Sequence, residues 1–224
     1  GRRINYATNY YDEVVAMRPP EGNWTISAQD LRGNVERTLA YPKSTDFSPT
    51  AAPIATTYSY IDECTDVNIA WCNRPISMTD PMGNVTNLEY NDYGQLTKEI
   101  GPASTPGAAR PTVVNEYEFR TAYIKDSAGS PVAAGPPISM LIRSFTCISS
   151  ATCDANTPEA DMVVSEYDYG PNTGLNNLLL RGMTVRAQNA EGQMEARRTC
   201  YEYNYFGERI SETLPGADLS SCPA

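Results

Sequence analysis

One short phrase recurs along this chain and limits what it can fold into. It reads Glu-Tyr-Asn-x-aromatic-Gly at residues 89–94 and again at 202–207, with shorter echoes at 116–119 and 166–170. A second phrase, Asp/Asn-x-x-Gly, stands upstream of several copies, most clearly from Asp30, Asp80 and Asn189. The recurrence of both phrases predicts a protein built from one small repeated unit.

Each phrase has a local structural meaning. In Asp-x-x-Gly, the aspartate caps its own backbone and the glycine supplies a positive φ, which together make a tight turn. The flanking segments, such as 85–90 and 95–100, alternate polar and apolar residues with the two-residue period of a strand. Each unit is therefore predicted to be a β-hairpin bounded by glycine turns. The residues expected to define the repeat are Asp30, Gly33, Asp80, Gly83, Tyr90, Gly94, Tyr167, Gly170, Gly192, Tyr203 and Gly207.

The predicted fold class is all-β, with consecutive antiparallel β-hairpins forming a curved, twisted sheet. Helical spacing of apolar residues is nearly absent, and the nearest candidate, 176–186, reads better as a strand, a glycine bulge and a second strand. Because the phrases continue on both sides of every insert, residues 1–224 are predicted to form a single repeat region of about five to six divergent hairpin units. Inserts rich in Pro, Ala, Ser and Thr are expected to be surface loops at 42–57, 101–112, 126–137 and 149–161.

Composition excludes several classes of function. The chain contains no histidine, so it cannot by itself build a Ser-His-Asp triad, a Cys-His dyad or a His-ligated metal centre. A net charge of −10 argues against nucleic acid and anionic membrane surfaces as partners. No apolar run approaches the roughly 20 residues of a membrane-spanning helix, so no membrane span is expected in this chain.

The six cysteines favour an exported protein. They stand at Cys64, Cys72, Cys147, Cys153, Cys200 and Cys222, without the C-x-x-C spacing of a zinc site. The economical pairing joins 64 with 72, 147 with 153, and 200 with 222, although six cysteines allow other connectivities and six reduced thiols remain the alternative. An even number in turn-rich stretches favours disulfides, hence a periplasmic, cell-surface or secreted location. The start at Gly1 rather than Met is expected to reflect a processed or cut fragment.

The paired phrases resemble the YD repeat of the Rhs family. The family's pattern is approximately a glycine turn, a strand ending in Tyr-x-Tyr-Asp, then x-x-Gly-Arg-Leu and another strand. The resemblance covers roughly two-thirds of the chain, and departs from the pattern in the cysteines, the long inserts and the mostly missing Asp after Tyr. The best segment, 80–100, matches through Gly83, Tyr90, Asp92, Gly94 and Leu96; the next, 189–214, matches through Gly192, Tyr201, Tyr203, Gly207, Arg209 and Ile210; the segment 30–41 matches only the opening half.

This resemblance implies a structural role. In the Rhs family, consecutive hairpins form a long sheet that spirals into a shell, and bacterial members enclose a toxin domain within it. The chain is accordingly expected to be a non-enzymatic structural repeat module, a segment of such a shell in a larger exported or surface protein, possibly toxin-associated. Its partner would then be the rest of its own parent polypeptide.

Two alternatives remain open at this point. The recurring tyrosines are expected to pack on the sheet, but exposed tyrosines or insert loops could instead bind a glycan or a protein. A remote alternative is a carboxylate-based enzyme acting on polysaccharide, for which the sequence singles out no pair of acids. The acidic groups at 62–66 and 159–161 lack EF-hand spacing, so neither a metal nor another cofactor is expected.

Overall fold

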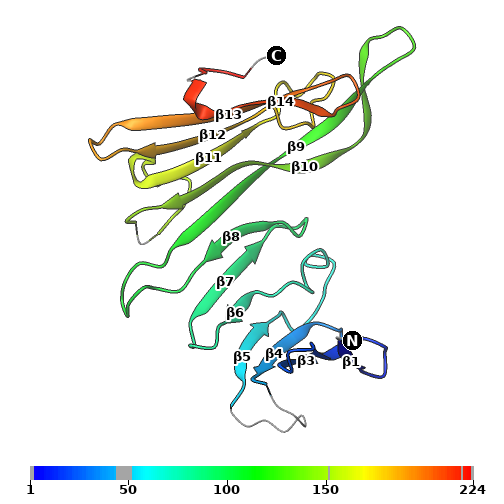
Figure 1. The fold of residues 1–224 in the computed structure, drawn as a ribbon. Coiled ribbons are helices and arrows are strands. Elements are labelled where there is room, and N and C mark those ends of the chain that lie inside the picture. Colours follow the sequence, from blue (N-terminus) through cyan, green and yellow to red (C-terminus); the bar gives the residue numbers. More distant parts are fainter. Residues whose placement is uncertain (1–2, 44–51, 151, 218, 223–224) are drawn as a thin grey trace. The chain divides into compact units, whose positions relative to one another are not determined.

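The computed structural model describes residues 3–43, 52–150, 152–217 and 219–222. The chain divides into two compact units, unit 1 (Gly1–Pro102) and unit 2 (Ala103–Ala224). Within each unit, every strand pairs antiparallel with the next strand in the sequence. The predicted all-β fold of consecutive antiparallel hairpins is therefore confirmed (Figure 1). Among the described residues, no helix is long and apolar enough to cross a membrane.

Unit 1 is a series of short strands joined by turns and two longer connections. The turns after β1, β3, β6 and β7 are tight, and the longer connections follow β4 and β5. Its strands are β1 (Asn5–Thr8), β2 (Val14–Arg18), β3 (Trp24–Gln29), β4 (Val35–Tyr41), β5 (Ile54–Ser59), β6 (Ser77–Thr79), β7 (Val85–Tyr90) and β8 (Leu96–Ile100).

Unit 2 has longer strands and the best-packed cluster of the chain. Phe145, Cys153, Met162 and Val164 are buried against one another, with Val114 and Cys147 beside them. Met162 and Val164 alternate with less buried neighbours along β11, as the two-residue period of a strand requires. The strands are β9 (Thr112–Lys125), β10 (Pro131–Cys147), β11 (Met162–Asp168), β12 (Gly182–Gln188), β13 (Met194–Tyr203) and β14 (Arg209–Thr213), with 3₁₀ turns η1 (Glu159–Asp161) and η2 (Pro215–Ala217).

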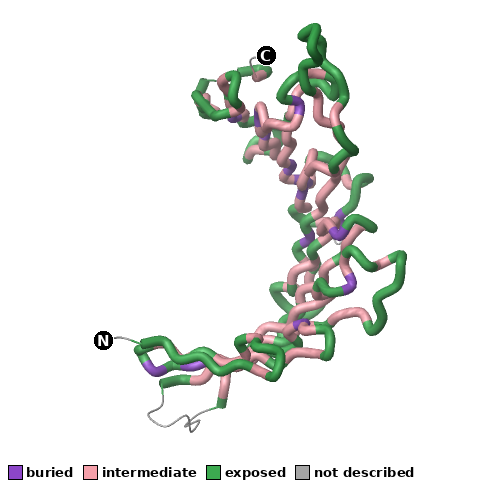
Figure 2. Tube along the Cα trace, turned by 90° about the vertical axis from the view of Figure 1, so that its right-hand side faces the viewer, coloured by how far each residue is buried: buried purple, intermediate pink, exposed green. Residues whose placement is uncertain are grey.

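Each unit, taken by itself, is a single-layer sheet with little covered core. Figure 2 shows buried residues only at scattered points along the trace. The 24.5 kDa chain exposes 14272 Å². Two independent compact domains of half this mass would together expose only about 12,000 Å². Large apolar side chains accordingly remain exposed on many described strands, including Val14, Ile54, Ile124 and Ile210.

Several predicted loops contain strand residues. The insert 42–57 ends inside β5, since its β-branched residues Thr56 and Thr57 pair with β4, and residues 44–51 lie outside the described part of the chain. The insert 126–137 is a tight turn at Asp126 followed by the start of β10, where Pro136 and Pro137 fall within a shift of register. Strand β9 begins at Thr112, the last residue of a third insert.

The prediction for 176–186 was wrong in its first half. Residues 175–178 form turns, and the strand begins only at Gly182. Leu178, Leu179 and Leu180 produced an apolar run that resembled a strand, although the backbone closes locally with Leu179 N–H donating to Asn176 O (2.9 Å). The expectation of a single repeat region over 1–224 stays a prediction.

Candidate functional site

One turn geometry closes most of the short hairpins. In Asp80, Oδ1 accepts the backbone N–H of Met82 (2.8 Å) and of Asn84 (2.9 Å), and the residue between them, Gly83, has φ +83°. We call this the Asx turn. Described copies begin at Asn9, Asp30, Asp80, Asn91, Asp126, Asn189 and Asn204.

The structure thus places most of the predicted repeat residues in turns. Asp30 and Asp80 accept the turn hydrogen bonds. Each turn's left-handed position is three residues after its Asx and holds glycine in all copies except the first, where Asp12 has φ 60°. Glycine reaches this conformation without the steric penalty of a Cβ. The predicted glycines at such positions are Gly33, Gly83, Gly94, Gly192 and Gly207.

In five of the seven described turns, a side-chain hydrogen bond joins the first and fifth residues. In the turns that begin at Asp30 and Asp80, an Asn four residues on donates its amide to the second carboxylate oxygen, as from Asn84 to Asp80 (2.8 Å). Where the turn begins with Asn, its amide donates instead to an acceptor, as from Asn91 to Gln95 (3.1 Å) and from Asn204 to Glu208 (2.7 Å). The two sequence phrases are therefore two chemical versions of one turn.

Four tyrosines fasten neighbouring backbone segments. The hydroxyl of Tyr90 donates to Pro75 O (3.0 Å), and that of Tyr203 donates to Leu180 O (2.7 Å). Tyr60 and Tyr169 donate in the same way to Val35 O and Leu141 O (both 3.1 Å). Burial raises the pKa of Tyr90, Tyr60 and Tyr169 above the ordinary value. The predicted repeat residue Tyr167 lies within β11, and Tyr169, two residues on, makes this contact instead.

All three proposed disulfides are present. They join Cys64 with Cys72, Cys147 with Cys153, and Cys200 with Cys222. The first two disulfides close short loops. The third fixes the C-terminal segment beside Gly182, and a Cβ added at Gly182 would clash with Cys222 Sγ. The three disulfides in the structure are compatible with an extracellular protein.

Acidic residues in the 149–161 loop serve its structure. The carboxylate of Asp161 accepts hydrogen bonds from the backbone N–H of Ser149 (2.8 Å) and of Ser150 (2.9 Å). Hydrogen bonds from Ser150 and Ser149 lower the pKa of Asp161 to about 2. Within the described segments, no cluster of three or more Cys, Asp or Glu side chains could hold a metal ion.

Two loops in different units share one backbone plan. The unit 1 loop (residues 60–76) precedes β6, and the unit 2 loop (residues 169–181) precedes β12. In unit 1, Arg74 N–H donates to Trp71 O (2.8 Å) and Leu88 N–H to Ile76 O (2.9 Å). In unit 2, the bonds at equal offsets run from Leu179 N–H to Asn176 O (2.9 Å) and from Tyr201 N–H to Arg181 O (2.8 Å). The Tyr90 and Tyr203 hydroxyl bonds also match, so Trp71 corresponds to Asn176 and Cys72 to Asn177.

The two loops differ in what anchors them. Fully buried Cys72 is tied to Cys64, whereas Asn177, 3% exposed, is held by hydrogen bonds alone. Its amide donates to Thr121 O (2.8 Å) and Asn172 O (3.1 Å), and its Oδ1 accepts from Tyr123 N–H (3.3 Å).

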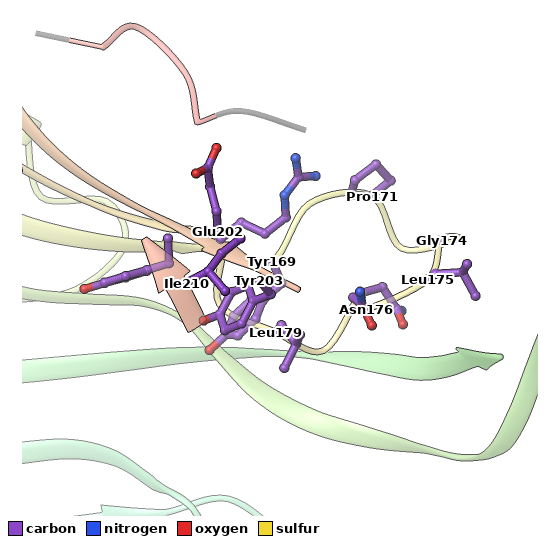
Figure 3. A pocket seen from close by; sticks show the side chains of 12 residues that line it. Tyr169, Pro171, Gly174, Leu175, Asn176, Leu179, Glu202, Tyr203 and Ile210 are labelled. Atoms are coloured by element: carbon purple, nitrogen blue, oxygen red, sulfur yellow. The ribbon is translucent and has the colours of Figure 1, made fainter. Parts of the chain in front are cut away.

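They differ also in what covers the tyrosine. In unit 1, the indole of Trp71 stacks on Tyr90 with ring centroids 6.2 Å apart and planes at 19°. The guanidinium carbon Cζ of Arg74 lies 5.8 Å from the centroid of the Tyr90 ring. In unit 2, a cavity of about 390 Å³ lies between the loop and β13–β14. Figure 3 shows Tyr169, Tyr203 and Leu179 projecting between the strands and the segment that carries Pro171, Leu175 and Asn176.

A second hollow and the exposed aromatic residues are less specific. A hollow of about 520 Å³ in unit 1 is lined by Arg32, whose guanidinium already bonds to Asp30 and to Ile61 O. Most strongly exposed rings lie at the tips of Asx turns: Tyr10, Tyr11, Tyr93, Tyr205 and Phe206. Two further exposed rings, Tyr6 and Phe119, lie on strands β1 and β9.

Sequence reasoning missed the cavity because the apolar run at 178–180 predicts a strand. A signal existed, since Met-Thr follows both loops at the same distance, at 78–79 and 183–184, which aligns the C-terminal ends of two loops of different length. The Asx turns at Asn9 and Asp126 were missed because one lacks glycine and the other lay in a presumed insert.

Comparison with known proteins identifies no family. No family model matches the chain, and no curated protein matches it. Among solved structures, it is similar to a chain of TcdB2-TccC3-TEV, with 15% identity over 94% of this chain and 11% of that chain, at a TM-score of 0.35. It is also similar to a chain of TcdB2-TccC3 without the hypervariable C-terminal region, with 13% identity over 93% of this chain and 10% of that one, at a TM-score of 0.43. The chain spans about a tenth of the length of these chains.

Proposed function

We infer that this chain is a non-enzymatic structural module, a segment of an Rhs/YD-repeat shell in a larger exported or surface protein. The resemblance of its paired phrases to the YD repeat supports the family. The Asx turns and tyrosine-to-carbonyl bonds recur in both units, which supports a scaffold role for the residues that repeat. In this proposal the repeated side chains act on their own backbone, and none is assigned a catalytic step.

The observation that carries the proposal is that each unit is a single-layer sheet with little core. The exposed area of 14272 Å² exceeds the roughly 12,000 Å² of two compact domains, and exposed apolar side chains accompany it. A sheet normally buries one hydrophobic face against a second layer. Here, further hairpins of the parent polypeptide, or contents enclosed by it, would cover these faces.

Disulfides support the exported location. Short loops closed by Cys64–Cys72 and Cys147–Cys153 stabilise a protein that has little core of its own. Such bonds persist mainly in oxidising compartments outside the cytosol. The native location is testable by fractionating the source cells and mapping the free thiols of the untreated protein.

The decisive experiment is the structure of the full-length gene product. We expect its density to show β1 and β14 each paired with a further hairpin, and the exposed faces covered by protein. Free edges at both strands, together with uncovered faces, would overturn the proposal. Glycan hydrolysis by the purified full-length product, abolished by replacing a specific pair of carboxylates, would also overturn its non-enzymatic part.

A second function, as a binding module, is favoured by one observation, the cavity of unit 2. Its volume of about 390 Å³ falls within the range of ligand sites. The exposed aromatic residues at turn tips offer a less enclosed surface for glycans. The cavity is the better-defined of the two.

A further inference from the structure

The unit 2 cavity has the lining of a binding site for a flat, partly polar group. The lining residues include Tyr169, Tyr201, Tyr203 and Leu179, together with the polar residues Asn176, Arg181 and Glu202. The hydroxyl bonds of Tyr169 and Tyr203 to backbone carbonyls fix two of these rings in place. A site whose walls are already ordered avoids much of the entropy loss that accompanies binding.

The equivalent place in unit 1 shows what such a site accommodates. There the indole of Trp71 stacks on Tyr90, and the matching backbone position in unit 2 is Asn176. Asn176 has φ 60°, whereas Trp71 has no positive φ, so the unit 2 loop turns differently at this point. Within the described residues, no second ring or guanidinium stacks on Tyr203, and this ring faces the cavity instead.

We propose that the unit 2 cavity binds the indole ring of a tryptophan side chain presented by a partner polypeptide. The internal precedent of Trp71 on Tyr90 identifies the ring type, and stacked aromatic pairs contribute beyond their buried area. A buried indole N–H needs an acceptor, and Asn176, whose side-chain amide carries one, is among the residues that line the cavity. Tryptophan is also a frequent anchor in protein interfaces. This inference goes beyond the structural role and does not depend on it.

The first experiment titrates the disulfide-intact chain with N-acetyl-tryptophanamide and follows its ¹H–¹³C NMR spectrum. We expect saturable shifts confined to the cavity residues, chiefly Tyr169, Tyr203, Leu175 and Leu179. N-acetyl-leucinamide and methyl glucoside serve as competitors of different chemistry. Saturable shifts with methyl glucoside but not with the tryptophan amide would overturn the proposal in favour of a sugar site. The absence of cavity shifts with the tryptophan amide would overturn it outright.

Variants separate binding in the cavity from adventitious binding elsewhere. Leu179→Trp should fill the cavity from within and abolish the saturable shifts. Asn176→Gly keeps the positive φ, removes a polar lining group and should weaken binding about fivefold. Its matched control is Asp12→Gly, which changes the other described non-glycine residue at φ 60°, in unit 1, and should leave the affinity unchanged.

The variants also keep the proposal falsifiable if one of them fails to fold. Complete disulfide formation and an unchanged far-UV spectrum verify the fold of each protein. Undiminished affinity in correctly folded Leu179→Trp would overturn the assignment to this cavity. If Leu179→Trp does not fold, an equal loss of affinity in Asn176→Gly and Asp12→Gly would overturn it, whereas a loss in Asn176→Gly alone would support it.

Discussion

The unit 1 loop and the unit 2 loop share the same backbone hydrogen bonds. A side chain fills the space above the tyrosine in unit 1, whereas a cavity remains beside the tyrosine in unit 2. In unit 1, Trp71 covers the tyrosine and a disulfide holds the loop. In unit 2, Asn177 holds the loop and a cavity remains beside the tyrosine. The repeat therefore specifies the strands, the turn and the tyrosine bond, while the loop sequence decides whether the space above the ring is filled. A scaffold of this kind can gain a binding site without changing its hairpins.

The largest expected difference concerns the glycines of the two turns that follow these tyrosines. Gly94 and Gly207 have φ +76° and +78°, but a Cβ on Gly94 would also meet the backbone carbonyl oxygen of Ala70, whereas the nearest atom to a Cβ on Gly207 is Leu179 Cδ1 at 3.7 Å. Gly94→Ala should lower the free energy of unfolding by about 3 kcal/mol, combining left-handed strain with a backbone clash. Gly207→Ala should lower it by only about 1 kcal/mol. Urea unfolding of both variants measures the difference, and equal losses would contradict the tight closure of the unit 1 loop.

Next in size is the anchor of each loop. Replacing Cys64 and Cys72 together by alanine should lower the free energy of unfolding by about 2.5 kcal/mol, as expected for opening a short covalent loop. Asn177→Ala removes three hydrogen bonds of a buried side chain and should cost about 2 kcal/mol. Limited proteolysis of the folded proteins locates each effect. Cleavage should increase at residues 60–76 in the first variant and at 169–181 in the second, and cleavage elsewhere would contradict the assigned anchors.

A third comparison tests whether the open site can be created in unit 1. Trp71→Ala should lower the free energy of unfolding by about 2 kcal/mol, less than for a fully buried tryptophan, because the residue is only half-buried. The space freed above Tyr90 should then take N-acetyl-tryptophanamide, seen as new shifts at Tyr90 and recovered thermal stability. Trp24→Ala is the control, because Trp24 stacks on Tyr41 away from the unit 1 loop and its loss should create no site on Tyr90. If N-acetyl-tryptophanamide does not restore the thermal stability of Trp71→Ala, the space above Tyr90 does not bind an indole ring, and the proposed equivalence of the two loops is wrong.

Much of the fold could be predicted from the sequence, because strand alternation and the Asp-x-x-Gly turns are local. The cysteine pairs were also readable, since each joins neighbours in sequence or the two cysteines left over. The cavity was not readable, because the leucines at 178–180 gave an apolar run like that of a strand. Tertiary bonds, among them those of Asn177 to the β9 backbone and of the Tyr203 hydroxyl to Leu180 O, hold that run as a loop. The side-chain hydrogen bond between the first and fifth residues of the Asx turns was equally hard to predict, because the sequence does not show which side-chain atom donates.

The smallest effect concerns the hydroxyl bonds that both loops share. Tyr90→Phe and Tyr203→Phe should each lower the free energy of unfolding by about 1 kcal/mol at neutral pH, since each leaves one backbone carbonyl without its donor. Burial raises the pKa of Tyr90, so the folded state holds that proton more tightly than the unfolded chain does. Its contribution is therefore complete below the unfolded value of about 10 and is lost as the pH rises through the higher folded value. Urea unfolding between pH 8 and pH 11 should show a shallower decline in Tyr90→Phe than in the wild type, and an unchanged decline would contradict the burial of this ring beneath Trp71.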